Sequence, residues 1–250
     1  MRRSVILALT LLAGLGPASL SRAEDAAPTC EVPGYLLASD STLSKVAAAI
    51  KGGKPLNVLV VGSRSSTIPA QEASAYPAQL QAALKEKLPS TPVNLSVEIL
   101  ASKTAEETGG SLVKLVEAKG PTLVIWQTGT VDAIRATDPD DFRTAVDEGV
   151  AALQKADVDV ILLNPQYSPR TETMTSLPPY LDNIRVVAQQ HGIPLFDRFT
   201  IMRQWNEQGD FDLFSPSHGV DLAKRVHACL GRALSKFVLD AARLDQAQQN

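Results

Sequence analysis

The 250-residue chain is poor in the residues that would indicate nucleic-acid binding, metal binding or membrane spanning. It has 24 lysines and arginines against 27 aspartates and glutamates, a balance that disfavours nucleic acid as a partner. It has two cysteines, and a structural zinc site needs four ligands, so no metal is expected. After the first 23 residues, no apolar run is long enough to cross a bilayer. The composition is that of one globular domain with a sizeable core.

The N-terminus has the pattern of a secretory signal peptide. Arg2 and Arg3 precede an apolar run over residues 5–15, and the small residues around Ala23 follow. We expect residues 1–23 to be cleaved and the mature protein to be periplasmic or secreted. An uncleaved membrane anchor is the alternative, but the run is short for one.

The two cysteines lie near opposite ends of the mature chain. In an oxidising compartment, Cys30 and Cys229 are expected to form a disulfide that joins the two ends of the domain. Closing so long a loop is worth roughly 5 kcal/mol by the loop-entropy model. Two buried free thiols are the alternative.

Hydrophobic periodicity predicts a parallel α/β fold. Residues 24–41 form an exposed lead-in that contains Cys30, residues 42–245 form a single domain, and residues 246–250 form a frayed tail. Strands alternate with helices five times, which predicts a sheet with helices on both faces. Strands are expected at 56–61, 93–100, 122–126, 158–163 and 193–196, and helices at 42–50, 76–88, 104–119, 139–153, 180–190 and 220–242.

The first strand ends in a cluster of hydroxyl side chains. The buried run 56–61 breaks at Gly62 and continues as Ser63, Arg64, Ser65, Ser66 and Thr67. Ligands of open parallel sheets bind at the carboxyl ends of the strands. In a flavodoxin-like strand order, this cluster would share one crevice with residues 128–132. The alternative is that these residues only form a turn and cap a helix.

A serine nucleophile needs a base, and the chain has three histidines. His218 lies in a loop directly before the last helix, where it could reach the strand ends. His191 ends a helix and fits a surface role, and His227 lies on the apolar stripe of the last helix, as a core histidine would. Asp212, Asp132 and Asp197 could each orient an imidazole, and the sequence does not choose among them.

These blocks resemble the SGNH or GDSL-type hydrolase superfamily. The resemblance rests on the Gly-Ser-x-Ser-Ser-Thr block, on residues 126–132 (Trp-Gln-Thr-Gly-Thr-Val-Asp), on residues 165–169 (Pro-Gln-Tyr-Ser-Pro) and on the late His218. It covers residues 57–234 and looks most like a group of exported proteobacterial proteins. It implies a three-layer α/β/α sandwich with a flavodoxin-like five-stranded parallel sheet. It also implies ester hydrolysis or acyl transfer by serine, without a cofactor.

The match to the superfamily blocks is incomplete. Aligned on Thr67, Ser65 takes the nucleophile position, with Ser63 and Ser66 as alternatives; aligned on Gly62, Arg64 takes it and cannot serve. The second block, at residues 101–104, lacks the glycine that donates to the oxyanion. In the third block Val131 replaces an asparagine donor. In the last block Ser215 replaces the aspartate three residues before the histidine.

The leading hypothesis is an exported serine esterase or acyltransferase with an atypical oxyanion hole, acting on an acylated envelope carbohydrate or a small ester. The alternatives are a catalytically silent protein that uses the crevice to bind an envelope glycan or partner, and a structural protein in which the fold is only a scaffold. The sequence does not set the oligomeric state. The predicted site comprises the catalytic residues Ser65, His218 and Asp212, and the oxyanion or substrate-binding residues Ser63, Gly129, Thr130, Asp132 and Gln166.

Overall fold

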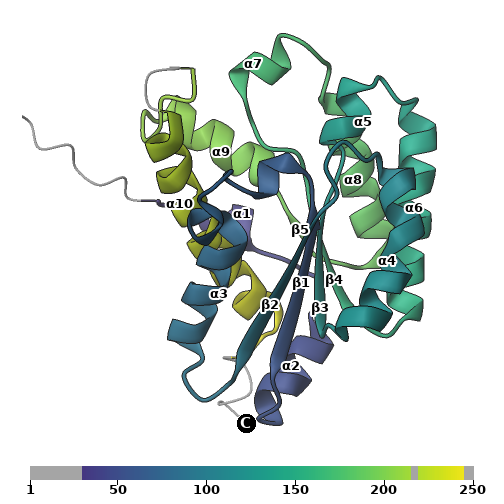
Figure 1. Ribbon diagram of the computed structural model, residues 1–250, viewed down its shortest axis with the longest axis vertical. Helices are drawn as coiled ribbons and strands as arrows, with labels where there is room; N and C mark the ends of the chain where they lie inside the picture. Colours follow the sequence, from purple (N-terminus) through teal and green to yellow (C-terminus); the bar gives the residue numbers. More distant parts are fainter. Residues whose placement is uncertain (1–29, 215–218, 245–250) are drawn as a thin grey trace, which may run out of the picture.

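The sheet has five parallel strands in the order β2-β1-β3-β4-β5. The computed structural model describes residues 30–214 and 219–244 (Figure 1). This order is the flavodoxin-like one, so the predicted fold is confirmed. The signal peptide, His218 and the tail lie outside the described residues, and the predictions made for them stand untested. The strands are β1 (Leu56–Gly62), β2 (Val93–Ile99), β3 (Leu123–Gln127), β4 (Asp159–Leu163) and β5 (Leu195–Phe196).

Helices cover both faces of the sheet (Figure 1). On one face α3 packs against α10, with α1 and α9 on the same side; on the other, α6 packs between α4 and α8. None of the described helices is both long enough and apolar enough to span a bilayer. The helices are α1 (Gly34–Leu37), α2 (Ser44–Lys51), α3 (Tyr76–Lys87), α4 (Ala105–Lys119), α5 (Thr130–Ile134), α6 (Pro139–Lys155), α7 (Pro169–Glu172), α8 (Pro178–His191), α9 (Arg198–Glu207) and α10 (Gly219–Ala241), with the short 3-10 turns η1 (Arg64–Ser66) and η2 (Glu72–Ser74).

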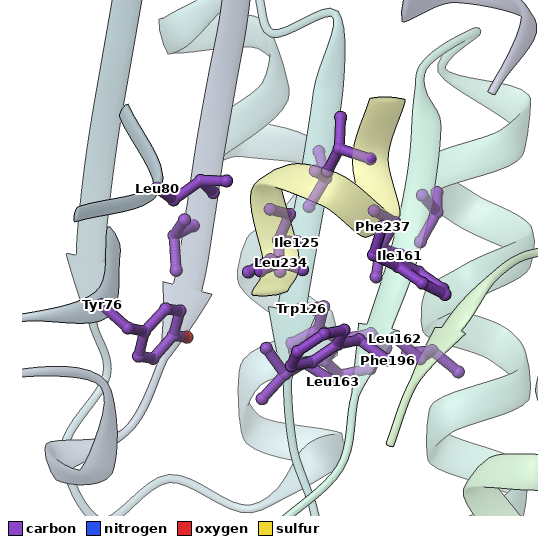
Figure 2. Packing of buried hydrophobic residues seen from close by; sticks show 14 of the residues in the cluster. Tyr76, Leu80, Ile125, Trp126, Ile161, Leu162, Leu163, Phe196, Leu234 and Phe237 are labelled. Carbon is purple, nitrogen blue, oxygen red and sulfur yellow. The ribbon is translucent and has the colours of Figure 1, made fainter. Parts of the chain in front are cut away.

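The central strands are buried on both faces, as their apolar sequences predict. Every residue of β3 is buried, whereas the edge strand β2 is only partly covered. Figure 2 shows side chains from the sheet, α3 and α10 meeting in one core, where the rings of Phe196 and Phe237 pack edge to face at 5.5 Å. On the opposite face, a Cβ at Gly149 of α6 would lie 2.5 Å from the Trp126 ring, so only glycine lets α6 approach β3 this closely.

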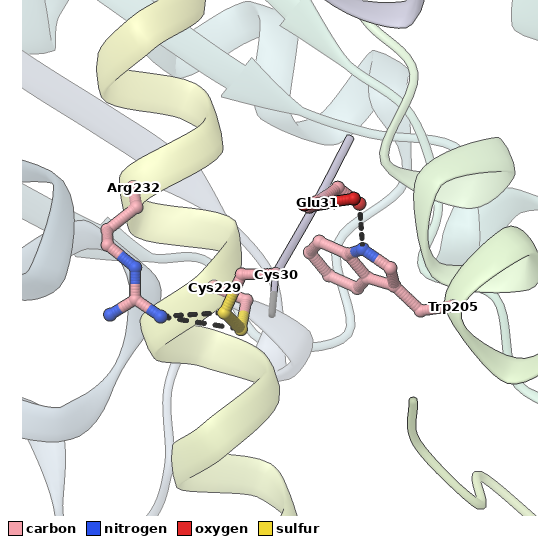
Figure 3. The surroundings of a disulfide bond; sticks show 5 residues. All are labelled: Cys30, Glu31, Trp205, Cys229 and Arg232. Atoms are coloured by element: carbon pink, nitrogen blue, oxygen red, sulfur yellow. Dashed lines mark hydrogen bonds between the residues drawn. A yellow bond between two sulfur atoms is a disulfide. The ribbon is translucent and has the colours of Figure 1, made fainter. Parts of the chain in front are cut away.

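The predicted disulfide between Cys30 and Cys229 is present and joins the lead-in to α10 (Figure 3). The two Cα atoms are 5.2 Å apart. Beside it, the indole N–H of Trp205 donates to the carbonyl oxygen of Glu31 at 2.8 Å. The lead-in also contributes Leu37 to the core. The N-terminal segment is therefore fixed to the domain by covalent, polar and apolar contacts.

Four short or medium helices were not predicted: α1, α5, α7 and α9. The most consequential is α9, which follows β5 directly. Asp197 caps it by accepting a hydrogen bond from the Thr200 N–H at 3.0 Å, and its buried face carries Phe199, Met202 and Trp205. The first residue of this helix, Arg198, lies at the predicted crevice.

Candidate active site

The hydroxyl cluster at the end of β1 forms the tight turn η1. Ser63 is its N-cap, with Oγ 3.5 Å from the Ser65 N–H, and the Ser66 N–H donates to the Ser63 carbonyl at 2.9 Å. The capping role considered for these serines is therefore real. It also means that the Ser66 N–H is already used within the turn.

Gln127, the last residue of β3, holds the three serines together. Its Oε1 accepts hydrogen bonds from the Ser63 N–H and Oγ, both at 2.9 Å, from Ser66 Oγ at 3.1 Å and from Ser65 Oγ at 3.4 Å. Gln127 is 4% exposed. Gly62 is required here because a Cβ would lie 2.3 Å from Ser66 Oγ. Gln127 belongs to the block 126–132 that carries the resemblance, but no role in the site was predicted for it from the sequence.

Ser65 also meets the guanidinium of Arg198, the first residue of α9. Nη2 donates to Ser65 Oγ at 3.1 Å, and Nη1 donates to the Ser65 carbonyl oxygen at 3.2 Å. Arg198 is 1% exposed, and burial lowers its pKa to about 10. The guanidinium is therefore protonated at neutral pH. Sequence reasoning missed Arg198 because nothing in its local pattern marks a buried cation.

A polar chain continues from the serines into the space between α3 and α10. Ser66 Oγ and the Tyr76 hydroxyl are 3.0 Å apart, and the Tyr76 N–H donates to His227 Nδ1 at 2.9 Å. Burial, opposed by the nearby Arg198 charge, raises the pKa of Tyr76. Burial and the same Arg198 charge lower the pKa of His227 to about 4.

His227 therefore has the wrong tautomer to serve as the base. Because Nδ1 accepts a hydrogen bond, the proton of the neutral ring is on Nε2, and that nitrogen has no lone pair to offer a serine hydroxyl. This agrees with the prediction of a buried core histidine. Among the described residues, no imidazole is hydrogen-bonded to Ser65.

All three candidate orienting carboxylates accept hydrogen bonds from other groups. Asp132 is 1% exposed and accepts the Ala105 N–H at 2.9 Å, and burial raises its pKa. Asp197 accepts the Asn164 amide at 2.7 Å in addition to capping α9. Asp212 lies in the segment that leads toward His218, where its Oδ1 accepts the Phe214 N–H at 3.1 Å.

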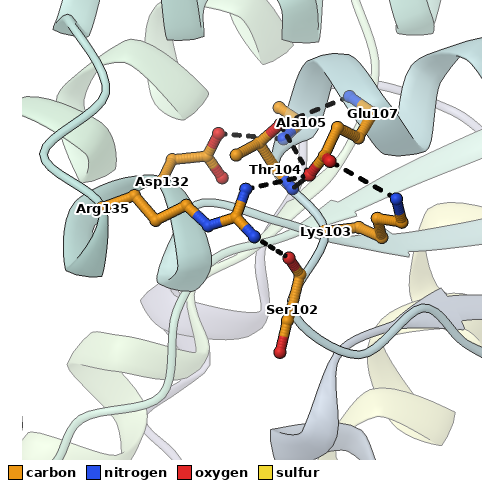
Figure 4. Close-up of polar contacts among 7 residues, drawn as sticks. All are labelled: Ser102, Lys103, Thr104, Ala105, Glu107, Asp132 and Arg135. Carbon is orange, nitrogen blue, oxygen red and sulfur yellow. Dashed lines mark hydrogen bonds and ion pairs between the residues drawn. The ribbon is translucent and has the colours of Figure 1, made fainter.

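The polar contacts at the start of α4 occupy the second-block stretch, residues 101–104 (Figure 4). Thr104 and Glu107 form a reciprocal capping box, and Arg135 bridges Glu107 and the carbonyl oxygen of Ser102. Ser102 has φ +62°, a conformation that favours glycine. The stretch thus has a glycine-like backbone where the superfamily's glycine is missing.

The other predicted site residues line two separate cavities. A small cavity of about 10 Å³ is bordered by Ser63, Lys103, Gly129, Thr130 and Val131. Thr130 Oγ1 accepts a hydrogen bond from the Gln127 amide at 3.4 Å, so its own proton remains to be donated. Gln166 borders a second cavity of about 190 Å³, which has both polar and apolar walls and lies beside His227. The geometry therefore groups Ser63, Ser65, Gly129 and Thr130 and separates Gln166 from them.

A comparison of the sequence with models of protein families identifies the family of this chain. Residues 29–244 match the model of the Non-GDSL lipase-like family. The chain belongs to this family. Among curated proteins, no sequence matches this chain.

Solved structures with a similar fold support the same placement of this Non-GDSL lipase-like protein. The esterase EstA from Pseudoalteromonas sp. is 18% identical with a TM-score of 0.53, over 78% of this chain and 99% of that one. A catalytic variant of Axe2, an acetylxylan esterase from Geobacillus stearothermophilus, is 16% identical with a TM-score of 0.59, over 73% and 94% of the two chains. The acetyl xylan esterase AlAXEase is 18% identical with a TM-score of 0.59, over 74% and 99%. At these identities the likeness establishes the fold alone. Together with the match to the family model, it confirms the predicted SGNH resemblance.

No cofactor or metal is implied by the family resemblance. Within the described part of the chain, no group of three or more histidine, cysteine, aspartate or glutamate side chains is placed to hold a metal ion. The groups at the carboxyl ends of β1 and β3 are serine and threonine hydroxyls, the Gln127 amide and the Arg198 guanidinium.

Proposed function

We propose that the protein is an exported SGNH-type serine esterase or acyltransferase with Ser65 as nucleophile, His218 as base and Asp212 as the orienting acid. The observation that carries the proposal is the position of Ser65. Its hydroxyl is half-buried at the carboxyl end of β1, on an SGNH fold, and a protonated guanidinium lies 3.1 Å away. Hydroxyls that act as nucleophiles need an environment that tolerates developing negative charge, and this one provides it.

The reaction would proceed through an acyl-enzyme. Ser65 Oγ attacks the ester carbonyl while His218 takes the hydroxyl proton, and the bond to the leaving alcohol breaks as the alcohol receives that proton. Water then releases the acid in a hydrolase, or a second alcohol takes the acyl group in a transferase. The Thr130 hydroxyl is the candidate donor to the oxyanion, in place of the asparagine replaced by Val131, because the backbone N–H groups of residues 103–105 already donate within the protein.

An acylated carbohydrate is the proposed substrate class. The similar structures include enzymes described as acetyl xylan esterases, and the cavity beside Ser63 and Thr130 is small, which favours a short acyl group over a long one. Export is proposed from the N-terminal signal pattern and is consistent with the Cys30–Cys229 disulfide.

A catalytically silent glycan-binding protein is the second candidate. It is favoured by the engagement of all three serine hydroxyls with Gln127 Oε1 and by Val131, which cannot donate to an oxyanion. In that case the crevice would bind an acetylated glycan without cleaving it.

The test is hydrolysis of a chromogenic acetyl ester by the purified protein and by Ser65→Ala, His218→Ala and the control Ser90→Ala, an exposed serine between α3 and β2, away from the carboxyl ends of the strands. We expect Ser65→Ala and His218→Ala to abolish activity and Ser90→Ala to retain it. A chromogenic phosphonate should label Ser65, as identified by mass spectrometry of the peptide. Melting temperatures belong in the experiment because Ser65→Ala removes an acceptor from buried Arg198.

Retained activity in Ser65→Ala would remove that residue as nucleophile. If the protein hydrolyses neither the simple ester nor acetylated xylo-oligosaccharides and is not labelled by the phosphonate, the esterase proposal fails. The catalytically silent glycan-binding protein is then the remaining candidate. Calorimetric titration with those oligosaccharides would then measure the binding that this second candidate requires.

A further inference from the structure

Arg198 is a buried cation without a carboxylate partner among the described residues. Its side chain is 1% exposed, and neither aspartate nor glutamate forms an ion pair with it. Its Nε is also buried and has no hydrogen-bond partner in the described part of the chain. Burying a charge is costly unless it is paired, so an unpaired arginine in this position requires an explanation.

The two side-chain hydrogen bonds that Arg198 makes to described residues both end on Ser65. Nη1 holds the backbone carbonyl and Nη2 holds Oγ. A guanidinium presents its donors in a rigid planar fork, so this pair of contacts fixes both the backbone and the hydroxyl of one residue. The strength of the Nη2 contact depends on the charge of Oγ, because a charged donor binds an anionic oxygen more strongly than a neutral one.

The groups packed around Arg198 do not neutralise it. Within the described residues, Tyr76 of α3 and His227 of α10 are the titratable groups whose charge interacts with it. The raised pKa of Tyr76 keeps the phenol neutral, and the lowered pKa of His227 keeps the imidazole neutral at pH 7. Ser65 Oγ, which the guanidinium contacts directly, is therefore the place in this part of the chain where negative charge can form beside Arg198.

We propose that Arg198 is a catalytic residue that stabilises negative charge on Ser65 Oγ as the hydroxyl loses its proton and attacks. The inference rests on the proposed function, since it requires Ser65 to be the nucleophile. Arg198 follows β5 and reaches Ser65 from the β4–β5 side, whereas the superfamily's oxyanion donors follow β2 and β3. Arg198 thus acts on the nucleophile rather than replacing the missing asparagine. Interactions that strengthen only as charge develops lower the barrier instead of merely binding substrate.

The experiment measures how fast Ser65 reacts with a chromogenic phosphonate, because this reaction reports nucleophilicity even when turnover is slow. Wild type, Arg198→Met, Arg198→Lys and the control Arg203→Met are compared. Arg203 lies on the same helix and is half-exposed, with Nε 3.6 Å from a Glu207 carboxylate oxygen, so its loss removes a cation from α9 without touching Ser65. The melting temperature of each variant is recorded.

We expect Arg198→Met to slow labelling and to lower kcat on the order of 10² to 10³-fold with little change in KM, the scale seen when one charge-stabilising donor is removed. Arg203→Met should react like wild type. Arg198→Lys should react at an intermediate rate, and its labelling should decline at a lower pH than in wild type, because a buried ammonium loses its proton more readily than a guanidinium.

The results separate the inference from the function on which it rests. If wild type neither turns over ester nor is labelled at Ser65, the proposed function fails. If wild type is labelled at Ser65 and a folded Arg198→Met reacts equally fast, the function stands and the inference is overturned. If Arg198→Met does not fold, Arg198→Lys decides: a wild-type rate and pH profile would also overturn it.

Discussion

The backbone N–H of Tyr76 donates to Nδ1 of His227 over 2.9 Å, joining the first turn of α3 to α10. The contact is next to the serine cluster, because the Tyr76 hydroxyl is hydrogen-bonded to Ser66. His227 therefore has a structural role beside the site, and His218 remains the predicted base.

The first prediction concerns the pH dependence of stability. The pKa of His227 is about 4 in the folded protein and about 6.5 when unfolded, so between these values the unfolded chain binds a proton that the folded one does not. The free energy of unfolding should therefore fall as pH falls from 6.5 to 4, by roughly 3 kcal/mol from this group. Urea titrations at several pH values measure it.

His227→Asn is the matched variant because its amide oxygen can still accept the Tyr76 N–H. We expect it to retain esterase activity and to lose this part of the pH dependence, so that the stability gap between wild type and variant narrows as pH falls. Equal slopes in the two proteins would contradict the assignment. Loss of activity in a stably folded His227→Asn would return this histidine to the catalytic candidates.

The second prediction separates a structural from a functional role for Asp132. Its buried carboxylate accepts the Ala105 N–H at the start of α4, and its pKa is raised by burial. The protonated form is thus favoured on folding, and this contribution to stability is lost as pH rises through the raised pKa. Asp132→Asn keeps the acceptor without the charge and should be at least as stable as wild type at pH 7.

Asp132→Ala should lose about 1 to 2 kcal/mol, because the Ala105 N–H at the helix start loses its acceptor. Both variants are expected to keep their kcat. A kcat lowered equally in both, with the fold intact, would show that Asp132 takes part in the chemistry, as the sequence prediction had it.

Much of the framework was readable from the sequence because it depends on local pattern. The buried run of β1, the break at Gly62 and the pairing of the two cysteines each follow from residues that have few other interpretations. The helix α9 also left a signal, since Asp197 is a capping residue and Phe199, Met202 and Trp205 recur at helical spacing. This indication of a helix was weak, because polar residues lie between the apolar ones throughout the segment.

The inner part of the site was not readable, because it depends on contacts between distant segments. Ser65 and Arg198 are 133 residues apart, and Ser63 and Gln127 are 64 apart. An arginine in a polar helix is ordinarily a surface residue, whereas Arg198 is buried where it contacts Ser65, a residue far away in the sequence. The sequence predicted that Asp132 lies at the crevice. It could not predict that the carboxylate accepts the Ala105 N–H, because this contact depends on where α4 begins in three dimensions.

The third prediction tests the disulfide. Cys30→Ser/Cys229→Ser removes a bridge that closes a loop of 199 residues, which the loop-entropy model values at roughly 5 kcal/mol. Denaturant unfolding of the oxidised wild type, the reduced wild type and the double variant should show a loss of several kcal/mol, equal in the last two. An unchanged unfolding midpoint on reduction would mean that the contacts of Glu31 and Leu37 alone hold the lead-in.

The last prediction uses the residue that departs most clearly from the superfamily pattern. Val131 borders the small cavity with Ser63 and Thr130, at the third-block position where related enzymes carry an asparagine donor. If Ser65 is the nucleophile and the oxyanion hole lacks this donor, Val131→Asn should raise kcat on the acetyl ester. One well-placed donor is worth on the order of 10² to 10³ in rate, and an amide introduced without its supporting contacts should recover part of that. Val131→Leu, which changes shape without adding a donor, is the control and should not exceed wild type. A Val131→Asn protein that folds but gains nothing over Val131→Leu would indicate that the oxyanion is stabilised from elsewhere, with the Thr130 hydroxyl the next group to remove.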